Sequence, residues 1–253
     1  LITNSLVLYG KQFEVDFDQL RSSFNNGVKM LLLCNPHNPT GKVFSVEELG
    51  RIGKLCCDYD IQIVSDEIHA DLILDNLKHT PISSLCSNFA KRTITLMSAS
   101  KAFNIAGLCL AFVHFGSDEL RKKFQRSPNH LLGGMNAISV AAVNAALEFG
   151  DDWLKKVLAQ LVKNRDFLSS HARRNWLNTI YSPGQATYLA WVNVSNLKIS
   201  GDISKYILHR SAVAVSPGAD FGNDGKDYFR LNFATSPDIL KEIVRRLDQS
   251  LSN

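Results

Sequence analysis

The sequence has no long apolar segment and no marked excess of charge of one sign. No window approaches the ~18 continuous apolar residues of a membrane-spanning helix, so we expect no membrane partner. The first twenty residues already contain Lys11, Glu14 and Asp16, which argues against a signal peptide and predicts a cytoplasmic protein. Lysine and arginine total 28 against 24 aspartates and glutamates and are scattered along the chain, which predicts no nucleic-acid partner.

Cysteine motifs and the common metal and phosphate motifs are also missing. Five cysteines, including the adjacent Cys56 and Cys57, form no CxxC pattern and no even set for a disulfide framework. Without a GxxxxGKS or GxxxxGKT loop, Asp66 and Glu67 do not fit the magnesium site of a P-loop enzyme. Without an HExxH motif or a second ligand pair, Asp66, Glu67 and His69 are weak metal candidates, and we predict no metal.

What the sequence does contain is three short, continuous apolar runs: MLLLC (30–34), IQIVS (61–65) and TITLM (93–97). Continuous rather than alternating apolar residues are typical of strands buried on both faces of a parallel sheet. Between the first two runs, Ser45 and Glu48 form a capping box at the start of an amphipathic helix. Strand, helix and strand at this spacing predict an α/β fold.

The pattern changes after residue 150. A long helix is predicted from Asp151 to about Asn175 and is followed by two strands, TYLAWVNV and YFRLNFA, with a helix between them and a last helix from Pro237. We therefore predict a large domain over residues 1–150, and a bridging helix with a smaller α+β domain over residues 151–253.

Each of the three apolar runs ends in a polar cluster: NPHNPTG, DEIHAD and SASK. Taken singly, these have ordinary explanations, since NPHNPTG could be a turn, Lys101 a solvated loop lysine, and Arg230 in YFRLNFA an edge-strand charge. In open α/β sheets, however, ligands bind outside the carboxyl ends of the parallel strands. A lysine, an aspartate, an asparagine and small hydroxyls at that edge suit an aldehyde cofactor with a basic ring nitrogen and a phosphate, namely pyridoxal 5′-phosphate (PLP).

The segments NPHNPTGKVFSVEEL, SDEIHADL, SASKAFNIAG and YFRLNFA, in this order, resemble the fold-type I PLP-dependent enzymes of the class I and II aminotransferase superfamily. Within it they are most similar to the PatB/MalY-like carbon-sulfur lyases (cystathionine beta-lyase-like). The resemblance implies an aspartate aminotransferase-like fold, with a mainly parallel sheet in the large domain, and a homodimer. The family's N-terminal arm and a glycine-containing phosphate loop have no counterpart, so we expect an N-terminally truncated member.

The resemblance also implies roles for individual residues. Lys101 matches the lysine that binds the cofactor aldehyde covalently and then acts as general base on the substrate. Asp66 matches the carboxylate that pairs with the ring nitrogen and keeps it protonated. Asn38 matches the asparagine that binds the cofactor ring oxygen and lies near the substrate carboxylate.

By the same resemblance, Ser98 and Ser100 bind the cofactor phosphate, and Arg230 binds the substrate carboxylate as a planar, bidentate fork. Two positions depart from the pattern of many aminotransferases. His69 stands where a cofactor-binding tyrosine is common, and Cys109 stands where an arginine often binds the phosphate. The DEIH sequence is similar to the PatB/MalY-like branch.

Three functions are compatible with these residues. The first is a PLP-dependent carbon-sulfur beta-lyase that acts on cystathionine or other cysteine-type amino acids and releases thiol, pyruvate and ammonia. The second is a class I or II aminotransferase, which would use the same residues. The third is an aminotransferase-like sensor domain of a transcription regulator, which the nearly balanced charge does not favour.

Overall fold

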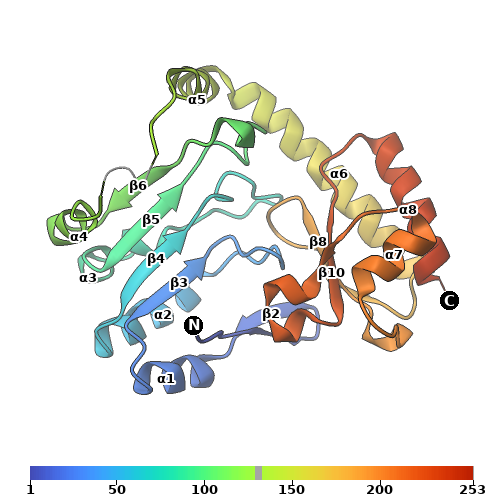
Figure 1. Cartoon of the computed structure of the whole chain (residues 1–253), viewed down its shortest axis with the longest axis horizontal. Helices are drawn as coiled ribbons and strands as arrows, with labels where there is room; N and C mark the ends of the chain where they lie inside the picture. The colour runs from blue at the N-terminus through green and yellow to red at the C-terminus, as the bar shows by residue number, and fades with distance from the viewer. Residues whose placement is uncertain (129–132, 253) are drawn as a thin grey trace.

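The structure is a computed structural model that describes residues 1–128 and 133–252 (Figure 1). The chain starts with a hairpin and a short helix, capped by the Asp16 side chain, which accepts a hydrogen bond from the Gln19 backbone N–H at 2.9 Å. The elements before the polar loop of NPHNPTG are β1 (Leu6–Tyr9), β2 (Gln12–Val15), α1 (Phe17–Asn25) and β3 (Met30–Cys34).

A four-stranded sheet in the order β3-β4-β5-β6 forms the centre of this part of the molecule. Strands β3, β4 and β5 run parallel, as predicted, and β6 joins the edge antiparallel to β5. The first and third apolar runs are strands over the predicted residues, whereas the second starts and ends one residue later. The further elements are β4 (Gln62–Asp66), α3 (Ser87–Ala90), β5 (Thr93–Met97) and β6 (Phe112–Phe115).

The predicted helix between the first two strands is α2 (Val46–Asp58), and its capping box is formed as expected. The Ser45 hydroxyl accepts from the Glu48 backbone N–H at 3.1 Å, and the Glu48 carboxylate accepts from the Ser45 N–H at 2.9 Å. Together with α1, this helix covers one face of the sheet, where Leu33, Leu49 and Ile52 belong to one buried apolar cluster.

The prediction that the strands are buried on both faces is wrong for β3. Leu33 exposes 7% of its surface on the helix-covered face, whereas Met30 and Leu32 expose 51% and 63% on the other. Met30 and Leu32 line an open cavity instead of a packed layer. A continuous apolar run predicts a strand, but which of its faces is covered depends on the packing of distant elements.

The second half of the chain builds a separate antiparallel sheet in the order β7-β8-β10-β9. The long helix α6 runs from α5 towards α8 and lies alongside this second sheet (Figure 1). The predicted division into two domains at residue 150 stays a prediction. The elements are α4 (Asp118–Phe124), α5 (Ala137–Phe149), α6 (Asp151–Asn175), β7 (Ile180–Tyr181), β8 (Leu189–Asn193), α7 (Ile203–Ser211), β9 (Ser216–Pro217), β10 (Tyr228–Asn232) and α8 (Pro237–Leu251).

Two apolar cores hold the molecule together. One lies between α1, α2 and the first sheet, and the other packs α6, α7 and α8 against β8 and β10, with Trp176 and Phe229 fully buried.

A bidentate ion pair connects α6 to the segment after β4, because Arg165 contacts both carboxylate oxygens of Asp75 at 2.9 Å. Within the described residues, no helix is both long enough and apolar enough to cross a membrane.

Candidate active site

The polar segments that follow β3, β4 and β5 leave the same edge of the first sheet, as predicted. The register pairs Cys34 with Asp66 and Asp66 with Leu96, so the three strands end level with one another. Beyond the last paired residues, the Asn35 N–H donates to the Asp66 carbonyl at 3.0 Å and the Glu67 N–H donates to the Leu96 carbonyl at 2.9 Å. This ladder brings the loops that carry Asn38, Asp66 and Lys101 to one place.

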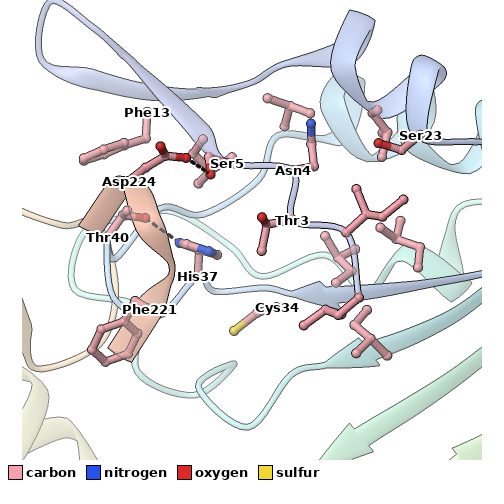
Figure 2. A pocket seen from close by; sticks show the side chains of 18 of the residues that line it. Thr3, Asn4, Ser5, Phe13, Ser23, Cys34, His37, Thr40, Phe221 and Asp224 are labelled. Carbon is pink, nitrogen blue, oxygen red and sulfur yellow. Dashed lines mark hydrogen bonds between the residues drawn. The ribbon is translucent and has the colours of Figure 1, made fainter. Parts of the chain in front are cut away.

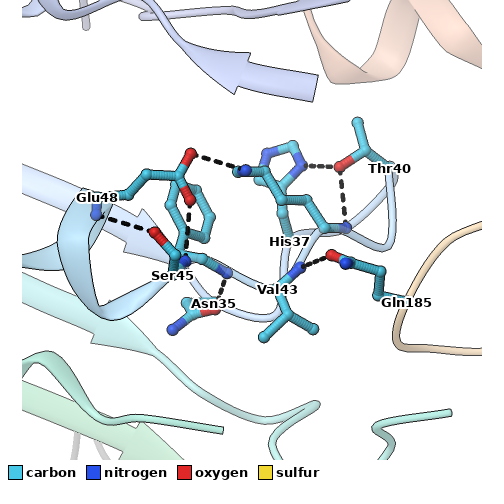
Figure 3. Close-up of polar contacts among 9 residues, drawn as sticks. Asn35, His37, Thr40, Val43, Ser45, Glu48 and Gln185 are labelled. Atoms are coloured by element: carbon cyan, nitrogen blue, oxygen red, sulfur yellow. Dashed lines mark hydrogen bonds and ion pairs between the residues drawn. The ribbon is translucent and has the colours of Figure 1, made fainter. Parts of the chain in front are cut away.

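The NPHNPTG segment is held by a dense set of polar contacts (Figure 3). The amide oxygen of Asn35, a buried residue, accepts from the Phe44 N–H at 3.2 Å. The ring of His37 lies 2.8 Å from the Thr40 hydroxyl, and burial, with a smaller effect of the Lys42 charge, lowers the His37 pKa to about 4. These contacts give the loop that carries Asn38 a defined shape.

Asn38, in the loop that follows β3 of the first sheet, and Arg230, on β10 of the second sheet, meet directly. The Arg230 Nη1 donates to the Asn38 Oδ1 at 3.0 Å, and its Nη2 donates to the Ser216 hydroxyl at 3.1 Å. The Phe221 ring stacks against the guanidinium, with 4.6 Å between the Arg230 Cζ and the ring centroid. The predicted cofactor-binding asparagine and substrate-binding arginine are therefore brought together.

Ser98, Ser100, Lys101 and Cys109 line one small cavity of about 250 Å³. The Ser98 hydroxyl donates to the Leu110 carbonyl at 2.7 Å and accepts from the Ser100 N–H at 3.1 Å. The Ser98 and Ser100 hydroxyls also lie 2.7 Å apart and are hydrogen-bonded to each other, so both are held at the wall of the cavity. Cys109, at the position where the resemblance places an arginine, lines the same cavity.

Asp66 ends β4, and its Oδ1 accepts from the Ile68 N–H at 3.2 Å, which starts the turn that leads to His69. The His69 side chain is buried, and its ring packs edge-on against the Tyr188 ring at 6.0 Å between centroids. Burial lowers the His69 pKa to about 4, with smaller contributions from the positive charges of Lys101 and Arg230. His69 is therefore neutral at neutral pH.

A second, larger cavity of about 690 Å³ is not lined by Lys101 or Asp66. Figure 2 shows it from close by, with Cys34, His37 and Phe221 among the residues of its wall. Its wall includes the N-terminal segment, β3 and the loop that carries Phe221 and Asp224. Cys34 and His37 also border it, and burial raises the Cys34 pKa to about 11. This cavity contains none of the residues predicted to bind the cofactor.

Sequence reasoning missed three residues at the site: Ser216, Phe221 and Tyr188. The first two hold Arg230, and the third packs on His69. Their segments were interpreted only as a loop and a strand. The pairing of β10 with β9 sets Arg230 opposite Ser216, and this signal for Ser216 exists only in the folded sheet.

The carboxylates of the DEIHAD segment do not gather around one point. Glu67 is buried against Ser65 and His79, on the side of the strand opposite to Asp66. Across residues 1–128 and 133–252, no group of three or more histidine, cysteine, aspartate or glutamate side chains is placed to hold a metal ion.

Comparison with known proteins identifies the family. The model of the family described as aminotransferase class I and II matches residues 4–247. The chain belongs to this family. The resemblance drawn from the four sequence motifs is thereby confirmed.

Relatives within the aminotransferase class I and II family include both lyases and aminotransferases. Cystathionine beta-lyase PatB from Bacillus subtilis is 33% identical over 255 residues, which cover 100% of this chain and 66% of PatB. The structure of a PLP-bound C-S lyase from Staphylococcus hominis is similar with a TM-score of 0.91 at 30% identity, covering 98% of this chain and 64% of that one. An aspartate aminotransferase from Pyrococcus abyssi is 28% identical over 242 residues, 95% of this chain and 61% of that protein.

These similarities confirm the predicted fold class, an aspartate aminotransferase-like α/β fold. The chain spans less than two thirds of the length of each of the three relatives.

The residues at the sheet edge fit the PLP of this family. Lys101 and Ser100 border one cavity, and the Asp66 carboxylate lies on the neighbouring strand end. Within the described part of the chain, the buried Nδ1 of His69 has no hydrogen-bond partner, which is what the wall of a polar ligand site presents. The amine, carboxylate, amide and hydroxyl groups at this edge are of the kinds that an aldehyde, a ring nitrogen, a ring oxygen and a phosphate require.

Proposed function

We propose that this chain forms the larger part of a PLP-dependent carbon-sulfur beta-lyase. Its substrates are cystathionine or other cysteine-type amino acids, and its products are thiol, pyruvate and ammonia. The observation that carries the proposal is the 3.0 Å hydrogen bond between Arg230 and Asn38. It places the arginine proposed to bind the substrate carboxylate beside the loop after β3, whose strand ends next to those that lead to Asp66 and Lys101. The DEIH sequence and the names of the lyase relatives favour beta-elimination over amino transfer.

PLP, when bound, supplies an aldehyde that takes up the substrate amino group and a ring that withdraws electrons from the substrate. Lys101 would hold this aldehyde covalently before substrate arrives, and its released amine would then take the proton from the substrate α-carbon. Asp66 would accept a hydrogen bond from the protonated ring nitrogen. The thiolate would leave the β-carbon with the bonding electron pair, and water would then hydrolyse the remaining fragment to pyruvate and ammonia.

The remaining residues bind and orient. Asn38 donates its amide N–H to the cofactor ring oxygen while its Oδ1 accepts from Arg230. Arg230 binds the substrate carboxylate with the guanidinium donors that Asn38 and Ser216 leave free. Ser100, supported by Ser98, donates to the phosphate. His69 lines the site as a neutral imidazole, and so adds no positive charge to that of Arg230.

The covalent step is tested by reducing the PLP-loaded protein with borohydride and locating the pyridoxyl group by mass spectrometry. We expect the adduct on Lys101 and its loss in Lys101→Ala, together with all turnover. The exposed Lys91→Ala serves as control and should keep the adduct. An adduct on another lysine, or none, would contradict the assignment.

Amino transfer is the second candidate, because an aspartate aminotransferase is among the relatives and would use the same residues. Incubation of the PLP-loaded protein with cystathionine and no oxo acid separates the two reactions. We expect pyruvate and thiol from the lyase. Amino transfer to an added oxo acid without pyruvate release would make the protein an aminotransferase.

A homodimer and a cytoplasmic location also belong to this proposal. The resemblance to the family supports the dimer, and the composition of the chain supports the location. Light scattering coupled to size-exclusion chromatography measures the first, and a mass of one chain would contradict it.

A further inference from the structure

Glu67 follows the proposed cofactor-binding Asp66 directly, yet its carboxylate has no place in the chemistry above. Its side chain is fully buried, with an exposed fraction of 0%. A buried carboxylate is costly unless hydrogen bonds compensate for the lost water. Glu67 has two such bonds: its Oε1 accepts from the Ser65 hydroxyl at 2.8 Å, and its Oε2 lies 2.7 Å from the His79 Nε2.

Side chains alternate along a strand, so Ser65 and Asp66 point to opposite sides of β4. Glu67, the residue after the strand, bonds to Ser65 and therefore lies on the side opposite to Asp66. Asp66 is on the side of the proposed ring nitrogen, and Glu67 lies beneath the same backbone. Directly beyond, the Ala70 N–H donates to the Glu67 carbonyl at 2.9 Å, closing the turn that carries His69. Glu67 thus holds the turn of residues 67–70 through its backbone carbonyl, while its side chain is fixed by Ser65 and His79.

His79 connects Glu67 to the loop that follows β3. It belongs to the segment between β4 and β5, and its side chain exposes 11%. The neighbouring Thr80 carbonyl accepts from the Asn35 side-chain Nδ2 at 3.4 Å, and the Asn35 side-chain Oδ1 accepts from the Phe44 N–H at 3.2 Å. One connected set of contacts therefore links Glu67 to the loop that carries Asn38.

We propose that Glu67 and His79 are positioning residues for the cofactor site. Their buried pair fixes the turn after Asp66 and, through Thr80 and Asn35, the loop of Asn38, so that both groups meet the cofactor ring in one orientation. This inference rests on the proposed function, because it requires that Asp66 and Asn38 bind PLP.

The test uses Glu67→Gln, which preserves the shape of the side chain but removes its charge. A charge-assisted hydrogen bond becomes a weaker neutral one, and we expect the affinity for PLP to fall by about fivefold or more. The ¹⁵N shift of the ring nitrogen in labelled PLP should move toward that of the free cofactor, because Asp66 no longer holds its orientation. His79→Leu should have both effects.

Two further variants distinguish positioning from a loss of stability. His79→Gln returns an N–H donor to the Glu67 carboxylate and should restore much of the affinity and the ring-nitrogen shift. Asp248→Asn is the matched control, since it weakens another carboxylate-histidine pair of 2.7 Å, between Asp248 on α8 and His171 on α6; the Asp248 Oδ1 also accepts from the Trp176 Nε1. It should lower the unfolding free energy and leave PLP affinity and the shift unchanged.

The proposal is overturned if Glu67→Gln and His79→Leu destabilise the protein as Asp248→Asn does, while PLP affinity and the ring-nitrogen shift stay as in the unsubstituted chain. If Glu67→Gln does not fold, the comparison of His79→Leu with His79→Gln decides in the same way. Failure of the unsubstituted chain to bind PLP would instead contradict the proposed function, and this inference with it.

Discussion

The imidazole of His69 is buried and has no positive charge at neutral pH. Burial is the main cause of its lowered pKa, and the charges of Lys101 and Arg230 add to it. A neutral ring can donate or accept a hydrogen bond, which suits a residue at the place of a cofactor-binding tyrosine. The same burial makes His69 sensitive to acid.

We expect the unfolding free energy to decrease as the pH falls from about 7 to 4, because unfolded His69 takes up a proton near its usual pKa of 6.5 whereas folded His69 does so only near about 4. The contribution of His69 to the unfolding free energy is complete above about pH 6.5 and is lost as the pH falls from there to about 4. His69→Gln should remove up to about 3 kcal/mol of this pH dependence, measured by urea unfolding at a series of pH values.

The exposed His209→Gln is the control for this prediction and should leave the pH dependence as it is. An equal pH dependence in His69→Gln and the unsubstituted protein would contradict the role of His69. His37, whose pKa is also lowered to about 4, accounts for acid sensitivity that remains after the substitution.

At the scale of elements, the site depends on a close backbone contact between two loops, the NPHNPTG segment and the segment of residues 184–186. The Gly41 carbonyl, in the NPHNPTG segment, accepts from the Gln185 and Ala186 N–H groups at 2.9 and 3.0 Å. Gly41 has a φ of +69°, and a Cβ there would lie 2.7 Å from the Ala186 carbonyl oxygen. Only glycine allows this approach, which brings the loop of Asn38 against the segment before β8.

Gly41→Ala should therefore destabilise the protein by more than about 2 kcal/mol, since left-handed strain adds to direct overlap with backbone atoms. It should also weaken PLP binding, because Asn38 lies on the displaced loop. Gly27→Ala is the matched control: Gly27 has a φ of +87° but no atom within 4 Å of an added Cβ. Its cost should be limited to about 1 to 2 kcal/mol, with PLP affinity unchanged.

Chemical unfolding and PLP titration of both variants check this prediction. Equal losses of stability in Gly41→Ala and Gly27→Ala would mean that the loops separate easily, and the contact would then have no part in placing Asn38.

At the scale of the whole molecule, the first sheet is covered unequally. Helices α1 and α2 bury the face of Leu33, whereas the neighbouring Leu32 exposes 63% of its surface on the other face. Burial, not residue type, determines what an apolar side chain contributes to stability. The two adjacent leucines of β3 therefore differ strongly in energetic importance.

Leu33→Ala should lower the unfolding free energy by about 2 to 5 kcal/mol, the usual cost of removing a buried leucine. Leu32→Ala should change it by less than about 1 kcal/mol, because the side chain is already in water. Unfolding in urea measures both, and binding of a dye for apolar surfaces should decrease in Leu32→Ala only. A loss for Leu32→Ala as large as that for Leu33→Ala would show that its face is covered in solution.

Much of the fold could be predicted from the sequence, and the site only in part. The capping box of Ser45 and Glu48 and the strands of MLLLC and TITLM were correct because each depends on residues close in the chain. The positions of Asn38, Asp66 and Lys101 at one sheet edge followed from the parallel order of the strands. The neighbours of Arg230 did not follow, since Phe221 and Ser216 reach it only through tertiary contacts.

The sequence by itself determined the elements, their order, and the residue types that stand at the strand ends, because periodicity, capping and turn formation are local. Only the tertiary structure decided which face of β3 is exposed, that the Glu67 carboxylate is buried against His79, and that Arg230 meets Asn38 across 192 positions of the chain. These depend on pairing and packing between segments far apart, which no local pattern encodes.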